Sequence, residues 1–243
     1  MKNLNKWTGL FILPFLLLPF LLLPVWASAS ADEVAKDGES VDVDSKIEGF
    51  LSAVQANDED GIERFLKEPG FVELADSDGH NALFIAAFLD REDVARRVVE
   101  MGIDIQGVDH QGWTAFCYAV LRDSEKTARF LVEKGLDLEN QACGSSNLTF
   151  LAAQSGSVGI MSLVLDNGGD PNAMVPSGAT PLVMAMGNGP LDVVRLLLEK
   201  GADPNQTVAD KNPLDWAIQK GDVTLIQLLQ EYDAKAEPGG DQD

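Results

Sequence analysis

The side chains that could carry out catalysis or bind a metal ion are few in this chain. Cys117 and Cys143 are the two cysteines, and His80 and His110 are the two histidines. A hydrolase or a metal centre needs Ser, Cys, His or carboxylate groups that converge on one point, and neither histidine belongs to a zinc-binding spacing. The sequence also assigns no base to Cys117. We therefore expect a protein that is not an enzyme and that has no cofactor and no metal ion.

The first residues are typical of a secretory signal. Lys2 and Lys6 precede an apolar run over 7–26, and small residues follow. This is the order of the charged, apolar and cleavage regions of a signal peptide. We therefore predict a signal peptide over 1–31 and an exported, periplasmic protein.

Two outcomes are open for this leader. Cleavage after Ala29 or Ala31 fits the small residues there, and three prolines within the apolar run favour it because each breaks helical hydrogen bonding. The run is also near the length that spans a bilayer. An inner-membrane anchor formed by the uncleaved residues 7–26 is therefore the alternative, and full secretion is another.

The charge of the chain limits its partners. It has 39 Asp and Glu against 18 Lys and Arg, a net charge of −21, and two of the lysines leave with the predicted signal. Nucleic acid and anionic membrane surfaces are poor partners for such a chain. We expect no nucleic acid partner, and no membrane contact after cleavage of the signal.

Two independent patterns recur with one period after the leader. Gly102, Gly135, Gly168 and Gly201 are 33 residues apart, and an apolar pair precedes each of them. A set of heptapeptides, from NALFIAA to NPLDWAI, has the same spacing apart from one interval of 32 residues. A period of this length is typical of stacked repeats, in which neighbouring units bury a continuous core.

The stretch 178–205, GATPLVMAMGNGPLDVVRLLLEKGADPN, resembles an ankyrin repeat almost from end to end. The Thr-Pro-Leu-His-x-Ala signature of that family stands here as Thr180-Pro181-Leu182-Val183-Met184-Ala185. The resemblance implies an all-α ankyrin-repeat solenoid of helix-turn-helix units with β-turn fingers. In each unit a short helix begins near the Thr or Asn, and a longer helix ends at the Gly.

The resemblance covers about 46–232. We expect an N-terminal half unit over 46–70, followed by five repeats that start near residues 76, 109, 142, 175 and 207. The flanking segments 32–45 and 233–243 are acidic and aperiodic. We predict that they form a flexible linker and a flexible tail.

Export makes a disulfide between Cys117 and Cys143 possible, because disulfides persist in oxidising compartments. Cys117 starts a predicted short helix and Cys143 lies on the next finger, so the two are neighbours in the stack. The bond needs Cα atoms within about 7 Å. Two thiols without a bond are the alternative, which would hold if Cys143 lies too near the fingertip.

The resemblance assigns partner contacts to the fingertips and to the ends of the short helices. Together with Trp113 on its finger, these positions predict the partner-binding residues Phe88, Leu89, His110, Gln111, Trp113, Leu121 and Arg122. The apolar members would form one cluster on the concave side, and exposed apolar clusters mark binding sites. Phe116 and Tyr118 are expected in the core by position.

An alternative reading of this cluster is purely structural. Asp90 and Asp123 stand where other repeats have the tight-turn residues Gly156 and Gly189. Phe88 and its counterpart in the next repeat would then pack on each other to compensate for the missing glycines.

For function, we expect a monomer that binds another protein as an inhibitor, an immunity partner or an accessory factor. The short Lys-containing start of the leader suggests a bacterial envelope protein. The alternative is an envelope scaffold or stress-protection factor that supports an enzyme such as a catalase. Fold alone does not choose between these roles, because repeat scaffolds serve many partners.

Overall fold

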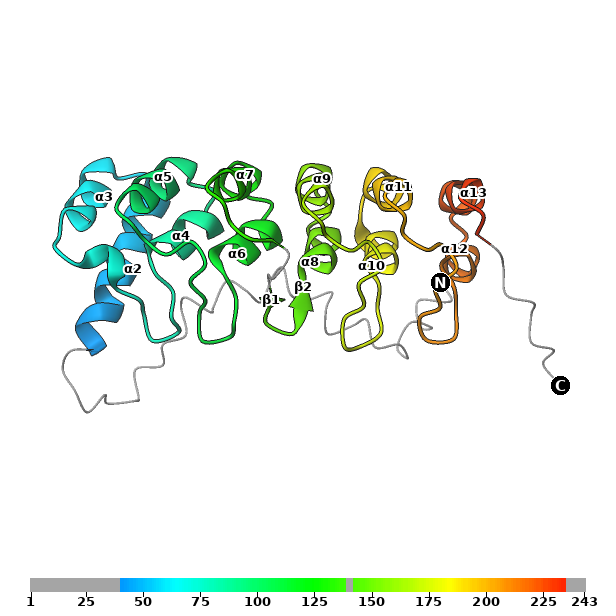
Figure 1. The fold of residues 1–243 in the computed structure, drawn as a ribbon, viewed down its shortest axis with the longest axis horizontal. Coiled ribbons are helices and arrows are strands. Elements are labelled where there is room, and N and C mark those ends of the chain that lie inside the picture. Colours follow the sequence, from blue (N-terminus) through cyan, green and yellow to red (C-terminus); the bar gives the residue numbers. More distant parts are fainter. Residues whose placement is uncertain (1–39, 139–141, 235–243) are drawn as a thin grey trace, which may run out of the picture. The chain divides into compact units, whose positions relative to one another are not determined.

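The computed structural model describes residues 40–138 and 142–234. Its contacts divide the chain into two compact units, Met1–Asp42 and Val43–Asp243, and the second unit contains the repeats. Within that unit the helices follow one another in pairs (Figure 1). The helices are α2 (Ser40–Ala56), α3 (Glu59–Leu66), η1 (Phe71–Glu73, a 3₁₀ turn), α4 (Ala82–Phe88), α5 (Glu92–Glu100), α6 (Ala115–Leu121), α7 (Glu125–Glu133), α8 (Leu148–Ser155), α9 (Val158–Asp166), α10 (Pro181–Asn188), α11 (Leu191–Glu199), α12 (Pro213–Lys220) and α13 (Val223–Glu231).

The pairs stack through like helices. The first helices of the pairs, α4, α6, α8, α10 and α12, contact one another in chain order, and so do α5, α7, α9 and α11. Figure 1 shows the two sets as two rows, with the loops before the first helices projecting beside them. We call the first set the inner helices and the second set the outer helices. This arrangement confirms the predicted all-α repeat fold.

Five hairpin fingers precede the inner helices. Finger 3 contains the short strands β1 (Ala142–Cys143) and β2 (Ser146–Asn147), which pair antiparallel. Each of the others is closed by a backbone hydrogen bond between its first and last residues, such as the one from Asp109 N to Trp113 O, 2.8 Å. The fingers are numbered in chain order: finger 1 (76–80), finger 2 (109–113), finger 3 (142–147), finger 4 (175–179) and finger 5 (208–211).

Each inner helix after a finger begins where the sequence predicts. A Thr or Asn side chain accepts a hydrogen bond from a backbone N–H of the first turn, which satisfies a donor that the helix itself leaves unpaired. These N-cap residues are Asn81, Thr114, Asn147, Thr180 and Asn212. A polar residue before an apolar run therefore positions every inner helix, and with it the residues at the finger base.

The outer helices end at the periodic glycines, as predicted. Gly102, Gly135, Gly168 and Gly201 all have φ between 89° and 95°, the left-handed conformation that glycine adopts without strain. Asp233 takes the corresponding position after α13, with φ 62°. The last repeat keeps this turn although its glycine is replaced.

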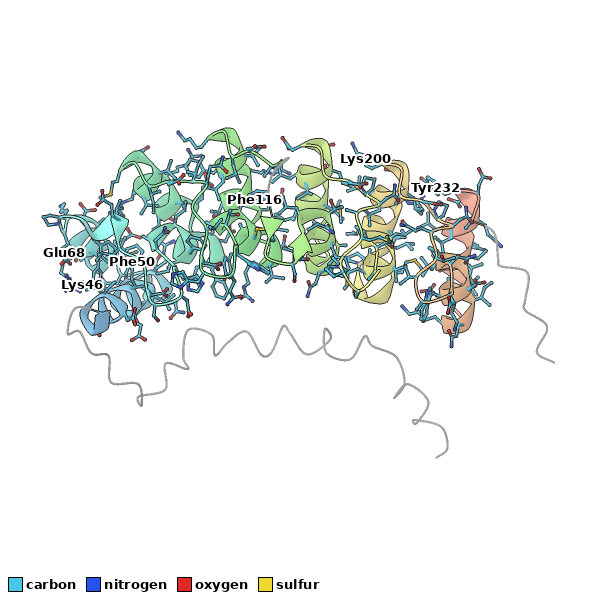
Figure 2. The ribbon with its side chains drawn as sticks, turned by 60° about the horizontal axis from the view of Figure 1, so that its bottom comes forward. Lys46, Phe50, Glu68, Phe116, Lys200 and Tyr232 are labelled. Carbon is cyan, nitrogen blue, oxygen red and sulfur yellow. A yellow bond between two sulfur atoms is a disulfide. The ribbon has the colours of Figure 1, made fainter. Side chains whose placement is uncertain are left out.

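The core lies between the stacked pairs. The alanine near the middle of each inner helix is fully buried, so that neighbouring helices approach closely, and large aromatic side chains such as Phe84, Phe116 and Phe130 are buried as well. At the N-terminal end, the buried ring of Phe50 packs against the ring of Phe71 with centroids 5.1 Å apart, and Lys46 forms an ion pair with Glu68 (Figure 2). No single unit could bury these side chains alone, and stacking is therefore what makes the core.

The N-terminal boundary differs from the prediction. Helix α2 begins at Ser40, so residues 40–45 of the predicted flexible linker are helical, and the linker prediction is wrong for them. In α2, the side chain of Asp44 accepts a hydrogen bond from Ser77 N of finger 1, 2.8 Å, which is a tertiary contact that the local composition does not indicate.

The predictions for the leader lie outside the described residues. These are the signal peptide, its cleavage and the anchor over 7–26. The predictions of flexibility for residues 32–39 of the linker and 235–243 of the tail also lie outside the described residues. Among the helices of the described part of the chain, none has the length and apolar character needed to cross a bilayer.

Candidate functional site

A disulfide joins the second repeat to finger 3. The Sγ atoms of Cys117 and Cys143 are bonded, and their Cα atoms are 5.8 Å apart, within the reach of such a bond. Cys117 lies in the first turn of α6 and Cys143 lies on β1, and both are fully buried. Cys143 pairs with Ser146 directly beside the turn of finger 3, so its place near the fingertip does not prevent the bond. Neither sulfur is a free thiol that could act as a nucleophile.

The predicted apolar cluster is built around Tyr118 of α6. The ring of Trp113 lies 5.3 Å from the Tyr118 ring, and the ring of Phe88 lies 6.4 Å from it. The guanidinium of Arg122 stacks on Phe88 at 4.6 Å, a favourable cation–π contact. The rings of Phe88, Trp113 and Tyr118 are all partly exposed. Tyr118 was expected in the core, so its partial exposure adds a residue to the surface.

The remaining apolar members lie at the ends of the inner helices. Leu89 is the C-cap residue of α4 and Leu121 is the last residue of α6, and both are partly exposed. Asp90 follows α4 and Asp123 follows α6 with φ of 51° and 56°, so each aspartate adopts the left-handed turn itself. Both turns are therefore made without glycine, and the structural reading, in which Phe88 and Leu121 pack on each other, stays open beside the binding reading.

The tip of finger 2 presents polar groups. His110 and Gln111 are both exposed. The backbone N–H of His110 donates to Asp78 O of finger 1, 3.0 Å, and that of Gln111 donates to the Asp109 carboxylate, 2.8 Å. The backbone of the fingertip is thus held in place while both side chains face solvent.

A buried polar network lies beneath this surface and was not predicted. His80 of finger 1 is 2% exposed, and its ring contacts Asp76 of the same finger and Tyr118 of α6. The Tyr118 hydroxyl in turn donates to Asp109 of finger 2, 2.8 Å. Burial, followed by this hydrogen bond, raises the pKa of Tyr118, so the phenol is neutral.

Part of this network has a signal in the sequence. Asp76 and Asp109 are one period apart, and each accepts backbone N–H groups of its own finger, a role that short polar side chains often have in turns. The equivalent of His80 in the next repeat is Trp113. A residue type that occurs once in a repeat pattern carries no signal of its burial, so only the packing of the two fingers identifies His80.

The described residues contain no candidate metal site. Within residues 40–138 and 142–234, no group of three or more His, Cys, Asp or Glu side chains is arranged to hold a metal ion.

Comparison with known proteins agrees with the geometry. The family model for ankyrin repeats (three copies) matches residues 50–142 and 149–238. An ankyrin repeat domain of known crystal structure from Acinetobacter baumannii AYE superposes with a TM-score of 0.65 and 26% sequence identity, over 76% of this chain and 98% of that one. No curated protein matches the chain.

Ankyrin repeats generally mediate contacts between proteins, and the family is typically non-catalytic. The inner helices, the fingers and the periodic helix ends of this chain have the order that such repeats require. The chain belongs to the ankyrin repeat family.

Proposed function

We propose that this chain is an exported, non-enzymatic module that binds a partner protein through fingers 1 and 2 and the C-terminal ends of α4 and α6. The observation that carries the proposal is the partly exposed aromatic cluster of Phe88, Trp113 and Tyr118, with Arg122 stacked on it. Aromatic and arginine side chains are the residue types enriched at binding hot spots.

The arrangement of this surface supports binding in a second way. The rings are held by one another and by the buried network, so little side-chain freedom is lost when a partner covers them. The two exposed side chains at the tip of finger 2, His110 and Gln111, add hydrogen-bonding groups at its edge. A rigid apolar centre with a polar edge is the usual anatomy of a protein interface.

The test is a pull-down from an envelope extract of the source cell, with the purified protein as bait. The variant carries Phe88→Ala, Trp113→Ala and Leu121→Ala. The matched control carries three similar truncations at exposed apolar positions elsewhere, Val158→Ala, Met174→Ala and Ile218→Ala, which are 42%, 57% and 51% exposed. Circular dichroism first checks that each protein is folded.

We expect one protein to be retained by the wild type and by the control but lost by the variant. Its identity then decides between an inhibitor, an immunity partner and an accessory factor. Retention by the variant would reject the proposed surface. It would favour the alternative role, an envelope scaffold or stress-protection factor that contacts its neighbours through other faces.

Export is the second part of the proposal, and the leader supports it. Mass spectrometry of the protein recovered from envelope fractions measures the N-terminus directly. Cleavage after Ala29 or Ala31 leaves Ser30 or Asp32 as the first residue. A retained Met1 in a membrane fraction would instead support the anchor over 7–26, and a retained Met1 in the cytosol would contradict export.

A further inference from the structure

The imidazole of His80 lies between two fingers of the proposed binding surface. Its Nδ1 is 3.2 Å from Asp76 Oδ2 of finger 1, and its Nε2 is 3.1 Å from Tyr118 Oη, next to finger 2. The Asp109 Oδ2 atom is 3.5 Å from the same Nε2. The side chains of His80 and Asp109 are 2% and 0% exposed, so water does not screen these contacts.

The hydrogen-bond partners in this group favour the protonated form of His80. The Tyr118 hydroxyl donates its one proton to Asp109 Oδ2, so its oxygen is an acceptor toward the histidine. The Asp76 carboxylate is an acceptor as well. Both ring nitrogens of His80 therefore face acceptors, and only the imidazolium form carries a proton on each nitrogen.

The charges around the ring act in the same direction. Burial is the largest single influence on the pKa of His80 and lowers it. The hydrogen bond to Asp76 and the charges of Asp76, Asp109 and Asp78 together outweigh burial, so the pKa lies above the usual value of 6.5. Phe84 of α4 packs on the ring and adds no charge.

Asp76 shows the reciprocal effect. Burial is again the largest influence and raises its pKa, but the hydrogen bonds and charge of His80 and the N–H of Asp78 outweigh it. The pKa of Asp76 is therefore lowered from 3.8. The two groups stabilise each other in their charged forms.

We propose that His80 is a proton-operated link between finger 1 and finger 2. In the protonated state Nδ1–H donates to Asp76, Nε2–H donates to Tyr118, and the Tyr118 hydroxyl remains on Asp109. When the Nε2 proton leaves to solvent, Nε2 becomes an acceptor and draws the Tyr118 hydroxyl proton toward itself. Asp109 then loses its buried donor.

Loss of that donor loosens finger 2. The other oxygen of Asp109, Oδ1, accepts the backbone N–H groups of Gln111 and Trp113 at 2.8 and 2.9 Å, which shapes the finger and places the Trp113 ring. A buried carboxylate with fewer donors favours exposure to water. The effect on partner binding rests on the proposed function of this surface, whereas the link itself does not.

The sign of the pH dependence follows from the two shifts. The folded-state pKa of His80 is raised, so its contribution to stability is complete below pH 6.5 and is lost as the pH rises through the raised value. The folded-state pKa of Asp76 is lowered, so its contribution is complete above pH 3.8 and is lost on further acidification. Both contributions are therefore complete between pH 3.8 and pH 6.5, and the link is intact in that range.

The first measurement is an NMR titration of the full exported chain with isotope-labelled histidine. The chain has two histidines, and the exposed His110 on finger 2 reports in the same spectra whether pH disturbs the finger surface generally. We expect both ring nitrogens of His80 to be protonated at pH 6, with a titration midpoint above 6.5. A neutral ring at pH 6, or a midpoint below 6.5, overturns the proposal.

A pair of variants tests whether the Asp76 carboxylate causes the raised midpoint of His80. In Asp76→Asn the charge is removed while an oxygen remains to accept N–H groups, and we expect the His80 midpoint to fall by about one pH unit or more. The matched control is Asp104→Asn, because Asp104 also accepts a turn N–H, from Gln106 at 2.9 Å. An equal shift in both variants, or none in Asp76→Asn, contradicts the link.

Hydrogen exchange measures the loosening itself. After correction for the intrinsic effect of pH, we expect the Trp113 amide to lose up to about tenfold protection for each pH unit between 6.5 and the raised His80 midpoint, and to level off above that midpoint. The Gly178 amide of finger 4, bonded to Val175 O at 2.8 Å, is the reference and keeps its protection. Parallel behaviour of the two amides would reject the link. A positive result together with a failed pull-down would leave the link intact and reject only the proposed function.

Discussion

Fingers 1 to 3 and fingers 4 and 5 belong to one fold, but their repeats are joined in different ways. In the first group, neighbouring fingers bond directly: His110 N donates to Asp78 O at 3.0 Å, and Gly144 N donates to Gly112 O at 3.2 Å. In the second group, the bonds run through the loops after the outer helices. There Asn172 accepts from Asp203 N at 2.7 Å and donates to Gly201 O at 2.9 Å.

The two kinds of contact also differ in sequence: one uses residues that follow the repeat pattern, and the other uses residues that depart from it. The loop contacts join Asn172 to Gly201 and Asp203, which belong to the stretch 178–205 that most resembles the family pattern. The finger contacts of the first group use residues that occur once, such as His80, Tyr118 and the disulfide pair. The partly exposed aromatic surface lies in that irregular half. Departure from the repeat pattern therefore coincides here with both the cross-links and the proposed binding site.

The disulfide carries one of the two largest expected effects. Replacing both Cys117 and Cys143 by Ala removes a cross-link between residues 26 positions apart. We expect the free energy of unfolding to fall by about 2–4 kcal/mol, mainly because the unfolded chain gains freedom. Urea unfolding without reductant measures it. A reductant should weaken the wild type by a similar amount and leave the variant unchanged, and equal midpoints for both proteins would show that the bond is unimportant.

The equivalent glycines Gly79 and Gly178 compare the two groups of fingers directly. Both are left-handed, with φ of 91° and 81°. A Cβ at Gly79 would lie 3.1 Å from Asp109 Cα and from His110 N, whereas a Cβ at Gly178 meets nothing within 4 Å. We expect Gly178→Ala to cost about 1–2 kcal/mol, from backbone strain. Gly79→Ala should cost roughly 1–3 kcal/mol more, from overpacking. Thermal and urea unfolding measure the stability of both variants. Equal losses of stability would mean that fingers 1 and 2 are not tightly joined.

The loop contacts of the second group have a smaller effect. We expect Asn172→Ala to lower the free energy of unfolding by about 1 kcal/mol, because two solvent-exposed hydrogen bonds are lost. Asn172→Asp is the control, measured at high salt to screen its added negative charge, since it keeps the acceptor for Asp203 N and loses the donor to Gly201 O. It should lose less, and an Asp variant as unstable as the Ala variant would argue that the acceptor contributes nothing.

The exposed ion pair between α9 and α11 has the smallest effect. Lys200 Nζ is 2.7 Å from Asp166 Oδ1, and its hydrogen bond is the main reason why the pKa of Asp166 is lowered. In Lys200→Ala we expect that pKa to rise toward its usual value in a carbon-detected NMR titration. The urea midpoint should not change measurably, because exposed pairs are screened by water. A clear loss of stability would show that this pair joins the repeats.

The sequence alone determined the repeat architecture of this protein. Caps such as Thr180 and turns such as Gly201 are local features, since a polar side chain before an apolar run and a left-handed glycine after it act within a few residues. Their recurrence every 33 residues indicated the stack, and it also placed Cys117 and Cys143 on neighbouring elements. The helical start of α2 at Ser40 was missed, because Asp44 bonds to finger 1 rather than to its own neighbours.

The tertiary structure decided which of the irregular residues work together. His80 and Tyr118 are 38 positions apart, and their contact depends on how finger 1 packs against α6. The sequence indicated that Tyr118 belongs to the core, but packing placed its ring at the surface and its hydroxyl in the buried network. Side-chain burial between two units depends on the shape of both, and a repeat pattern describes only what the units have in common.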